Sequence, residues 1–163
     1  MANVQDVDRL DLERYVGMWF EVGRLPLRFE DDDARDVTAE YSLNDDGTVR
    51  VDNRCLDENG EPDQVVGDAV VDPEHSGRLR VSFLPNGLRW IPFTRADYWV
   101  LHVDEDYRHA LVGTPDRKHL WLLSRESKIE DAVERSFLDV ARAQGYDLGA
   151  WIRPEQSKRV VDG

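Results

Sequence analysis

Short runs of residues that alternate between apolar and polar recur along most of this chain. In residues 37–43, VTAEYSL, every second residue is apolar, a period of two that is typical of a strand with one buried face. Turn-forming dipeptides such as Asp46-Gly47 separate the runs and favour hairpins. The pattern predicts eight strands, at residues 18–27, 37–43, 48–56, 65–71, 78–84, 97–103, 108–113 and 119–125.

Two other segments have helical patterns. Residues 11–15 read as a short helical turn with Asp11 as its cap, and residues 128–145 predict a longer helix that Gly145 ends. We expect this helix to pack on the outside of the last two strands, and the tail, 146–163, to wrap the sheet and then fray. The apolar positions that share one face of the helix are Ile129, Val133, Phe137, Val140 and Ala141.

The first and last predicted strands carry a complementary pair of side chains. Trp19 begins the first strand just after Gly17, and Arg125 closes the last one. A guanidinium over an indole face is worth roughly 0.5–2 kcal/mol. If the two side chains meet, the first and last strands are neighbours and the sheet closes. The fold class predicted is therefore all-β, an eight-stranded antiparallel up-and-down barrel.

Three short motifs, in order along the chain, resemble the signatures of the lipocalins: Gly17-x-Trp19, Asp106-Tyr107 in a tight turn, and Arg125. Longer stretches such as RYVGMWFEVGRLPLRFE and VTAEYSLNDDGTVRVDNRC resemble the bacterial lipocalin subfamily, the relatives of apolipoprotein D. The resemblance implies one lipocalin domain over residues 1–163, with a barrel at about 17–125, a helix at about 128–145 and a tail at 146–163. It also implies that small hydrophobic molecules bind inside the barrel.

Alternation along the strands and analogy with apolipoprotein D together indicate which side chains face the interior. Each candidate has an alternative role as simple packing that fills the barrel. We expect the signature residues Gly17, Trp19, Asp106, Tyr107 and Arg125 to be structural, and Arg24, Arg54 and Arg108 to lie on the surface. The candidates for the ligand cavity are Tyr41, Asn53, Cys55, Phe83, Trp90, Tyr98, Trp121 and Leu123.

The segment 85–96, PNGLRWIPFTRA, is too irregular for a strand, yet it carries several large apolar side chains, Trp90 among them. Such side chains on a long loop need an explanation. Either the loop folds back on the barrel as a flap, or it forms a hydrophobic rim that admits lipid or meets a second copy in a homodimer.

The composition of the chain restricts the classes of partner that it can bind. The chain has 163 residues and a net charge of −13, which argues against binding nucleic acid and against adsorption to an anionic membrane surface. Cys55 is the one cysteine, so an internal disulfide is impossible. The N-terminus shows no signal peptide, lipid-attachment cysteine or membrane anchor. We expect a soluble, cytoplasmic protein; the periplasm or outer membrane is the alternative if the chain was trimmed.

Motifs for catalysis are missing from the sequence. The four histidines show no metal-binding spacing, and no glycine-rich phosphate loop precedes a helix. We therefore expect no catalytic residues, no metal and no cofactor. The function predicted is binding, transport or scavenging of fatty acids, lysophospholipids or similar amphiphiles. Two alternatives stay open: a lipid-modifying enzyme that depends on Cys55, and a filled barrel that acts as a structural or assembly module.

Overall fold

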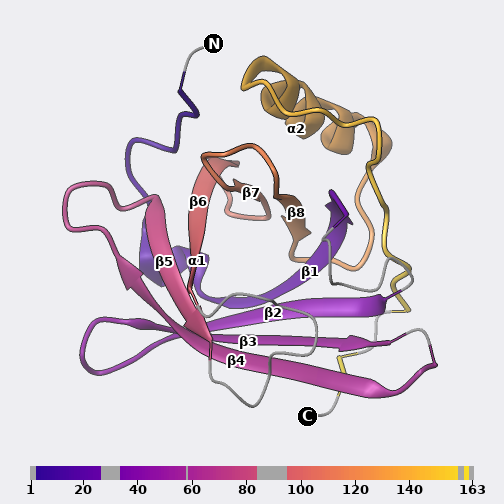
Figure 1. Cartoon of the computed structure of the whole chain (residues 1–163), viewed down its shortest axis with the longest axis horizontal. Coiled ribbons are helices and arrows are strands. Elements are labelled where there is room, and N and C mark those ends of the chain that lie inside the picture. The colour runs from indigo at the N-terminus through magenta and orange to yellow at the C-terminus, as the bar shows by residue number, and fades with distance from the viewer. Residues whose placement is uncertain (1–2, 27–33, 58, 84–94, 158–159, 162–163) are drawn as a thin grey trace.

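A computed structural model describes residues 3–26, 34–57, 59–83, 95–157 and 160–161. The described part contains eight strands and two helices (Figure 1). In chain order they are α1 (Leu12–Tyr15), β1 (Gly17–Arg24), β2 (Arg35–Leu43), β3 (Val49–Leu56), β4 (Pro62–Val71), β5 (Arg78–Phe83), β6 (Arg95–Val103), β7 (His109–Gly113), β8 (Leu120–Ser124) and α2 (Asp131–Ala143).

The strands form one closed barrel in which each strand pairs with its neighbours in sequence and β8 pairs with β1. Every pairing is antiparallel, so the predicted fold class is confirmed. In Figure 1 the strands follow one another around a ring. We call the end of the barrel near α1 the base, and the opposite end, where β1 ends and β8 begins, the mouth.

The base is closed by the predicted meeting of Trp19 and Arg125. The guanidinium carbon of Arg125 lies 3.7 Å from the centre of the Trp19 ring, and Trp19 is fully buried. Gly17 has a φ of +108°, and a Cβ there would lie 3.2 Å from Arg125 Nη1, so both backbone and space favour glycine. The guanidinium also donates hydrogen bonds of 2.8–3.1 Å to the main-chain oxygens of Arg14, Tyr15, Met18 and Tyr107.

The β6–β7 turn is stabilised by a different acid from the one in the sequence motif. Asp104 accepts hydrogen bonds from the main-chain nitrogens of Arg108 and His109 and from the His109 ring, while Asp106 is exposed. Tyr107 has a φ of +54°, and its hydroxyl accepts a hydrogen bond from the main chain of Asp11. Tyr107 therefore links this turn to the start of α1 by a hydrogen bond.

Three tyrosines fill the interior just above the base, and we call Tyr15, Tyr41 and Tyr98 the tyrosine cluster. The Tyr98 hydroxyl donates to that of Tyr41 at 2.8 Å and lies 2.5 Å from that of Tyr15. The cavity between these rings and the surrounding apolar side chains has a volume of about 10 Å³, which is room for about one water molecule. The lower interior is therefore packed.

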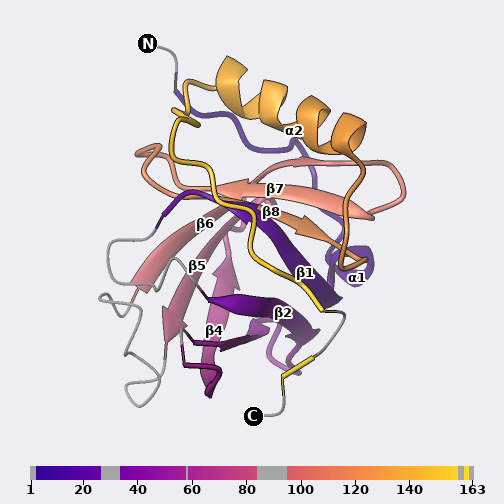
Figure 2. The same ribbon diagram turned by 90° about the vertical axis from the view of Figure 1, so that its right-hand side faces the viewer.

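Helix α2 covers one side of the barrel from outside, as Figure 2 shows over β7. Its residues Phe137 and Ala141 pack with Leu111, Leu120 and Leu122 of β7 and β8, which confirms the predicted packing. The helix begins three residues later than predicted, because Glu130 has an extended backbone. Gly145, with a φ of +89°, follows its end, as the sequence indicated.

The tail runs beside β1 and takes the place of a strand. The pairing of β1 with β2 extends only to Phe20 and Thr38. Beyond it, Ile152 pairs with Arg24, and the Gln156 side chain donates to the main-chain oxygens of Glu21 and Val37. The predicted fraying is wrong at Val161, which is 1% exposed and accepts a hydrogen bond from Arg54.

Replacing Arg125 with lysine tests the closure of the base. Lysine keeps the charge but lacks the planar fork that reaches four carbonyl oxygens, so we expect the free energy of unfolding to fall by about 3 kcal/mol. Urea denaturation measures the change. Arg142→Lys is the matched control, because Arg142 is exposed and pairs only with nearby Asp139 among the contacts seen here, and it should change stability by less than about 0.5 kcal/mol. Equal midpoints for the two variants would contradict this role.

Alkaline titration tests the tyrosine cluster. Burial raises the pKa of Tyr15, Tyr41, Tyr98 and Tyr146, four of the five tyrosines. Below about pH 10 these groups are protonated in both folded and unfolded chains. Above it only the unfolded chain loses their protons, so stability should fall by up to about 1.4 kcal/mol per pH unit for each tyrosine. Tyrosinate absorbance should therefore show four groups ionising together with unfolding; gradual ionisation of the folded protein would refute the cluster.

Candidate functional site

The strand register identifies the side chains of the inner wall, because residues directly opposite each other point to the same face. Tyr98 pairs with Leu79, and Trp121 with Val112, both in the apolar cluster of the barrel interior. The same reasoning places Tyr41, Asn53, Cys55 and Leu123 on this wall. Phe83 pairs with Gly67 along the backbone, and Trp90 lies outside the described residues.

The inner wall is accessible above the packed base. Asn53 lies in the middle of β3 and Trp121 near the start of β8, and both are partly exposed although they face the inside of a closed barrel. Tyr41 and Leu123, by contrast, are buried. An inward side chain in a closed barrel can be reached by solvent only through interior space. The accessible part of the inner wall therefore lies between the tyrosine cluster and the mouth.

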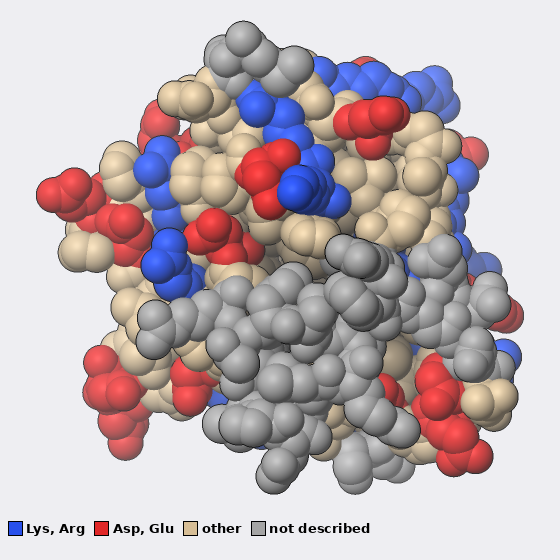
Figure 3. Space-filling model, in the orientation of Figure 1, with Lys and Arg blue, Asp and Glu red and all other residues tan. Residues whose placement is uncertain are grey.

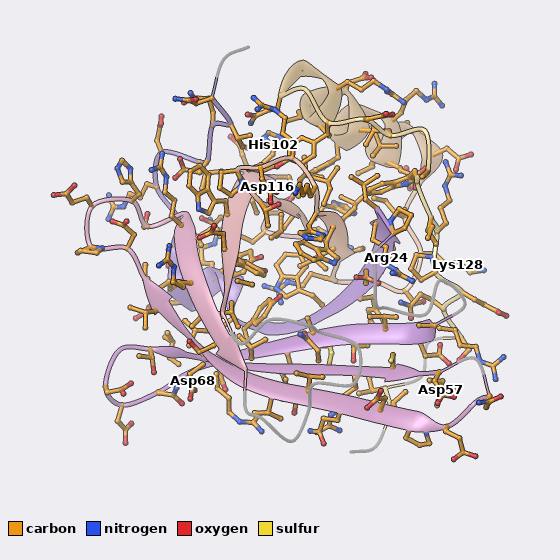
Figure 4. All side chains as sticks on the ribbon, in the orientation of Figure 1. Arg24, Asp57, Asp68, His102, Asp116 and Lys128 are labelled. Carbon is orange, nitrogen blue, oxygen red and sulfur yellow. The ribbon has the colours of Figure 1, made fainter. Side chains whose placement is uncertain are left out.

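A charged pair, missed in the sequence, stands on this wall. Arg24 pairs across the barrel seam with Trp121, and Glu21 with Leu123, so both face inward. The Nε atom of Arg24 lies 3.5 Å from a carboxylate oxygen of Glu21. Arg24 is fully buried, so the surface position predicted for it is wrong. Figure 4 labels Arg24 at the upper end of β1.

A β-bulge brings the pair together. Residues three apart on a regular strand point to opposite faces, but the register shifts by one residue between Glu21 and Gly23. Val22 then faces outward, in the cluster beneath α2. A Cβ on Gly23 would lie 2.1 Å from the ring of Trp151, so the tail packs directly on this glycine. A glycine inside a predicted strand is a known signal of a bulge. Gly23 was therefore the sequence signal that could have revealed this bulge.

The pair adds charge to an otherwise mostly apolar wall. The charge of Glu21 contributes to the raised pKa of Tyr41, of which burial is the larger cause. Asp63 lies opposite Cys55 on the inner face close to the mouth. Together with the Asn53 amide, these groups can donate and accept hydrogen bonds inside the barrel.

The remaining sequence candidates lie elsewhere. Cys55 is buried against Ala34 and Val37. Arg54 lies on the outer face, where it donates to Asp52, and Arg108 is exposed, so both arginines are at the surface as predicted. Among the described residues, no group of three or more His, Cys, Asp or Glu could hold a metal ion.

Two clefts lie on the outer surface formed by the described residues. One, of about 270 Å³, lies between the start of α2, β1 and the tail; the other, of about 570 Å³, lies over β4, β5 and β6. Basic and acidic side chains are interspersed over the described part of the face in Figure 3. Within the described ranges, neither helix is long and apolar enough to cross a membrane.

Comparison with known proteins agrees with this architecture. The family of lipocalin-like domains matches residues 10–156. Temperature-induced lipocalin-1 of Arabidopsis thaliana is 40% identical over 154 residues, 93% of this chain and 82% of the relative. The outer membrane lipoprotein Blc of Escherichia coli is 39% identical, covering 92% and 81%. Apolipoprotein D of Cavia porcellus is 27% identical, covering 92% and 79%.

Solved structures agree as well. Insecticyanin from the tobacco hornworm Manduca sexta superposes with a TM-score of 0.74 at 22% identity, covering 96% of this chain and 86% of its own; at that identity the likeness shows the fold. The sequence relatives cover most of the chain at up to 40% identity. The protein is therefore a member of the lipocalin family, related to bacterial Blc and to apolipoprotein D.

Proposed function

We propose that this protein binds a small hydrophobic or amphiphilic molecule, such as a fatty acid or a lysophospholipid, inside its barrel and carries or scavenges it. The observation that carries the proposal is the partial exposure of Asn53 and Trp121 on the inner wall of a closed barrel. Membership of the lipocalin family supports it. We also propose that the whole chain acts as one binding unit.

The inner wall suits an acyl chain. It combines apolar side chains with the ring of Trp121, and the packed tyrosine cluster gives the space a floor. Burying methylene groups at ~0.8 kcal/mol each gives a gross gain of order 10 kcal/mol for a long chain. The loss of ligand freedom on binding offsets part of that gain, so dissociation constants from micromolar to nanomolar are expected.

A carrier role fits the described residues better than catalysis by Cys55. The thiol is buried against the apolar side chains of Ala34 and Val37, whereas a reactive cysteine sits in a partly exposed, electropositive setting. The loop expected to form a rim or a dimer contact, which includes Trp90, lies outside the described residues, so the homodimer stays a prediction. The cytoplasmic location has no support, because the bacterial Blc relatives are outer membrane lipoproteins by name.

A bulky substitution inside the barrel tests the proposal. Asn53→Trp should fill part of the interior space that Asn53 faces and weaken binding of a fluorescent fatty-acid analogue at least about tenfold. Val70→Trp is the matched control, because Val70 is 59% exposed on the outer face of β4, and its affinity should equal that of the wild type. Fluorescence titration measures both, with circular dichroism to verify folding.

The outcomes separate a carrier from a filled barrel. Wild-type protein that binds neither the analogue nor any lipid seen by native mass spectrometry would refute the proposal and favour the assembly module. Unchanged affinity in a folded Asn53→Trp variant would place the ligand outside the barrel.

A further inference from the structure

We propose that the tyrosine cluster sets an upper limit on the length of the acyl chain that the barrel takes up, and that the Tyr98 ring is the group that the end of the chain meets. This inference rests on the proposed function and deepens it, because it names the residues that select among hydrophobic ligands. Tyr98 is the member of the cluster that is partly exposed, whereas Tyr15 and Tyr41 are buried.

The ring of Tyr98 borders the interior space of the barrel. Tyr98 lies directly opposite Leu79, a buried residue of the interior apolar cluster, so both side chains point inward. The barrel is closed, and an inward ring that is partly exposed is reached through the interior. The Tyr98 hydroxyl lies 2.5 Å from that of Tyr15 in α1, which places the ring at the end of this space nearer the base.

Packing and hydrogen bonds hold the ring of Tyr98 in place. It meets the Tyr41 ring edge-on with centroids 5.8 Å apart, and its hydroxyl donates to that of Tyr41. Tyr41 stacks on Tyr15 at 5.7 Å, and Tyr15 packs against Trp19 at 5.3 Å. A chain that moved the Tyr98 ring aside would have to break these contacts, so the cluster acts as a stop.

Apolar side chains border the small cavity behind the three rings. Val49, Val51 and Ala69 line it, and its volume of about 10 Å³ leaves no room for an acyl chain. Removing the Tyr98 ring would join this cavity to the space on the other side of the ring. Further methylene groups could then be buried against the same apolar wall, so the bulk of the ring is what limits the chain.

A series of saturated fatty acids, from about eight to about eighteen carbons, tests the inference. Each added methylene group should strengthen binding to the wild type about fourfold while it is buried in the barrel. The gain should stop where the end of the chain reaches Tyr98, and we call that chain length the limiting length. Dissociation constants are measured by displacement of the fluorescent fatty-acid analogue, at concentrations too low for the acids to form micelles.

Two substitutions of Tyr98 separate the bulk of the ring from its hydrogen bonds. Tyr98→Ala leaves a cavity where the ring stood, so the limiting length should rise by at least about two methylene groups. Tyr98→Phe keeps the ring and should leave the limiting length unchanged. Trp99→Ala is the matched control, because Trp99 is the next residue of β6 and is also partly exposed. It packs in the outer cluster beneath α2, so its loss should not change the limiting length.

Each result has a definite reading. An unchanged limiting length in a folded Tyr98→Ala variant would overturn the inference and leave the carrier function standing. The same holds if Tyr98→Phe or Trp99→Ala raises the limiting length as much as Tyr98→Ala does, or if the gain in the wild type continues through the whole series.

Circular dichroism verifies that each variant folds. If Tyr98→Ala does not fold, Tyr98→Leu takes its place; a smaller increase in the limiting length is expected, and no increase would overturn the inference. Failure of the wild type to bind any acid of the series would overturn the carrier function, and this inference with it.

Discussion

The contact between Arg125 and Trp19 is the constraint on which the barrel depends. One guanidinium stacks on the indole and bonds to main-chain oxygens of α1, of β1 and of the turn before β7. It thereby joins residues up to 111 positions apart in the chain. A sheet with free edges is prone to pair with other chains, and closing the first strand onto the last removes those edges. Arg125 donates hydrogen bonds to the main-chain oxygens that closure of the barrel brings together at the base.

The base and the mouth of the barrel differ in packing and in strand pairing. At the base the tyrosine cluster packs so closely that only about one water volume is left. Toward the mouth β1 parts from β2, and the tail supplies the missing hydrogen bonds through Ile152 and Gln156. This arrangement leaves the backbone of β1 bonded on both sides where β2 departs from it.

The buried Glu21–Arg24 pair shows how a small backbone irregularity changes the chemistry of a fold. One extra residue in β1 turns two charges toward the interior and one valine toward α2. A buried ion pair is weak evidence for stability, since apolar residues of similar size often serve as well. Arg24 lies opposite Trp121 and is fully buried, so the bulge changes which side chains form this part of the inner wall.

Much of the architecture could be read from the sequence because it depends on short-range patterns. Alternation along each run, the Asp-Gly turn and the spacing of apolar residues in α2 are local properties, and Gly17, Trp19 and Arg125 mark the two ends of one closed sheet. The inward positions of Tyr41, Tyr98 and Trp121 followed from the same alternation. The family resemblance rested on these residues too.

Only the tertiary structure shows where the alternation of inward and outward side chains breaks down. Alternation assigns faces within a regular strand, and the bulge at Val22 reverses the faces after it, so Arg24 is buried rather than exposed. Two other features likewise depend on hydrogen-bond geometry. The tail takes the place of β2 beside β1, and Asp104 rather than Asp106 stabilises the β6–β7 turn. Sequence patterns record the preferences of neighbouring residues, whereas these features arise from contacts between segments that only the folded chain brings together.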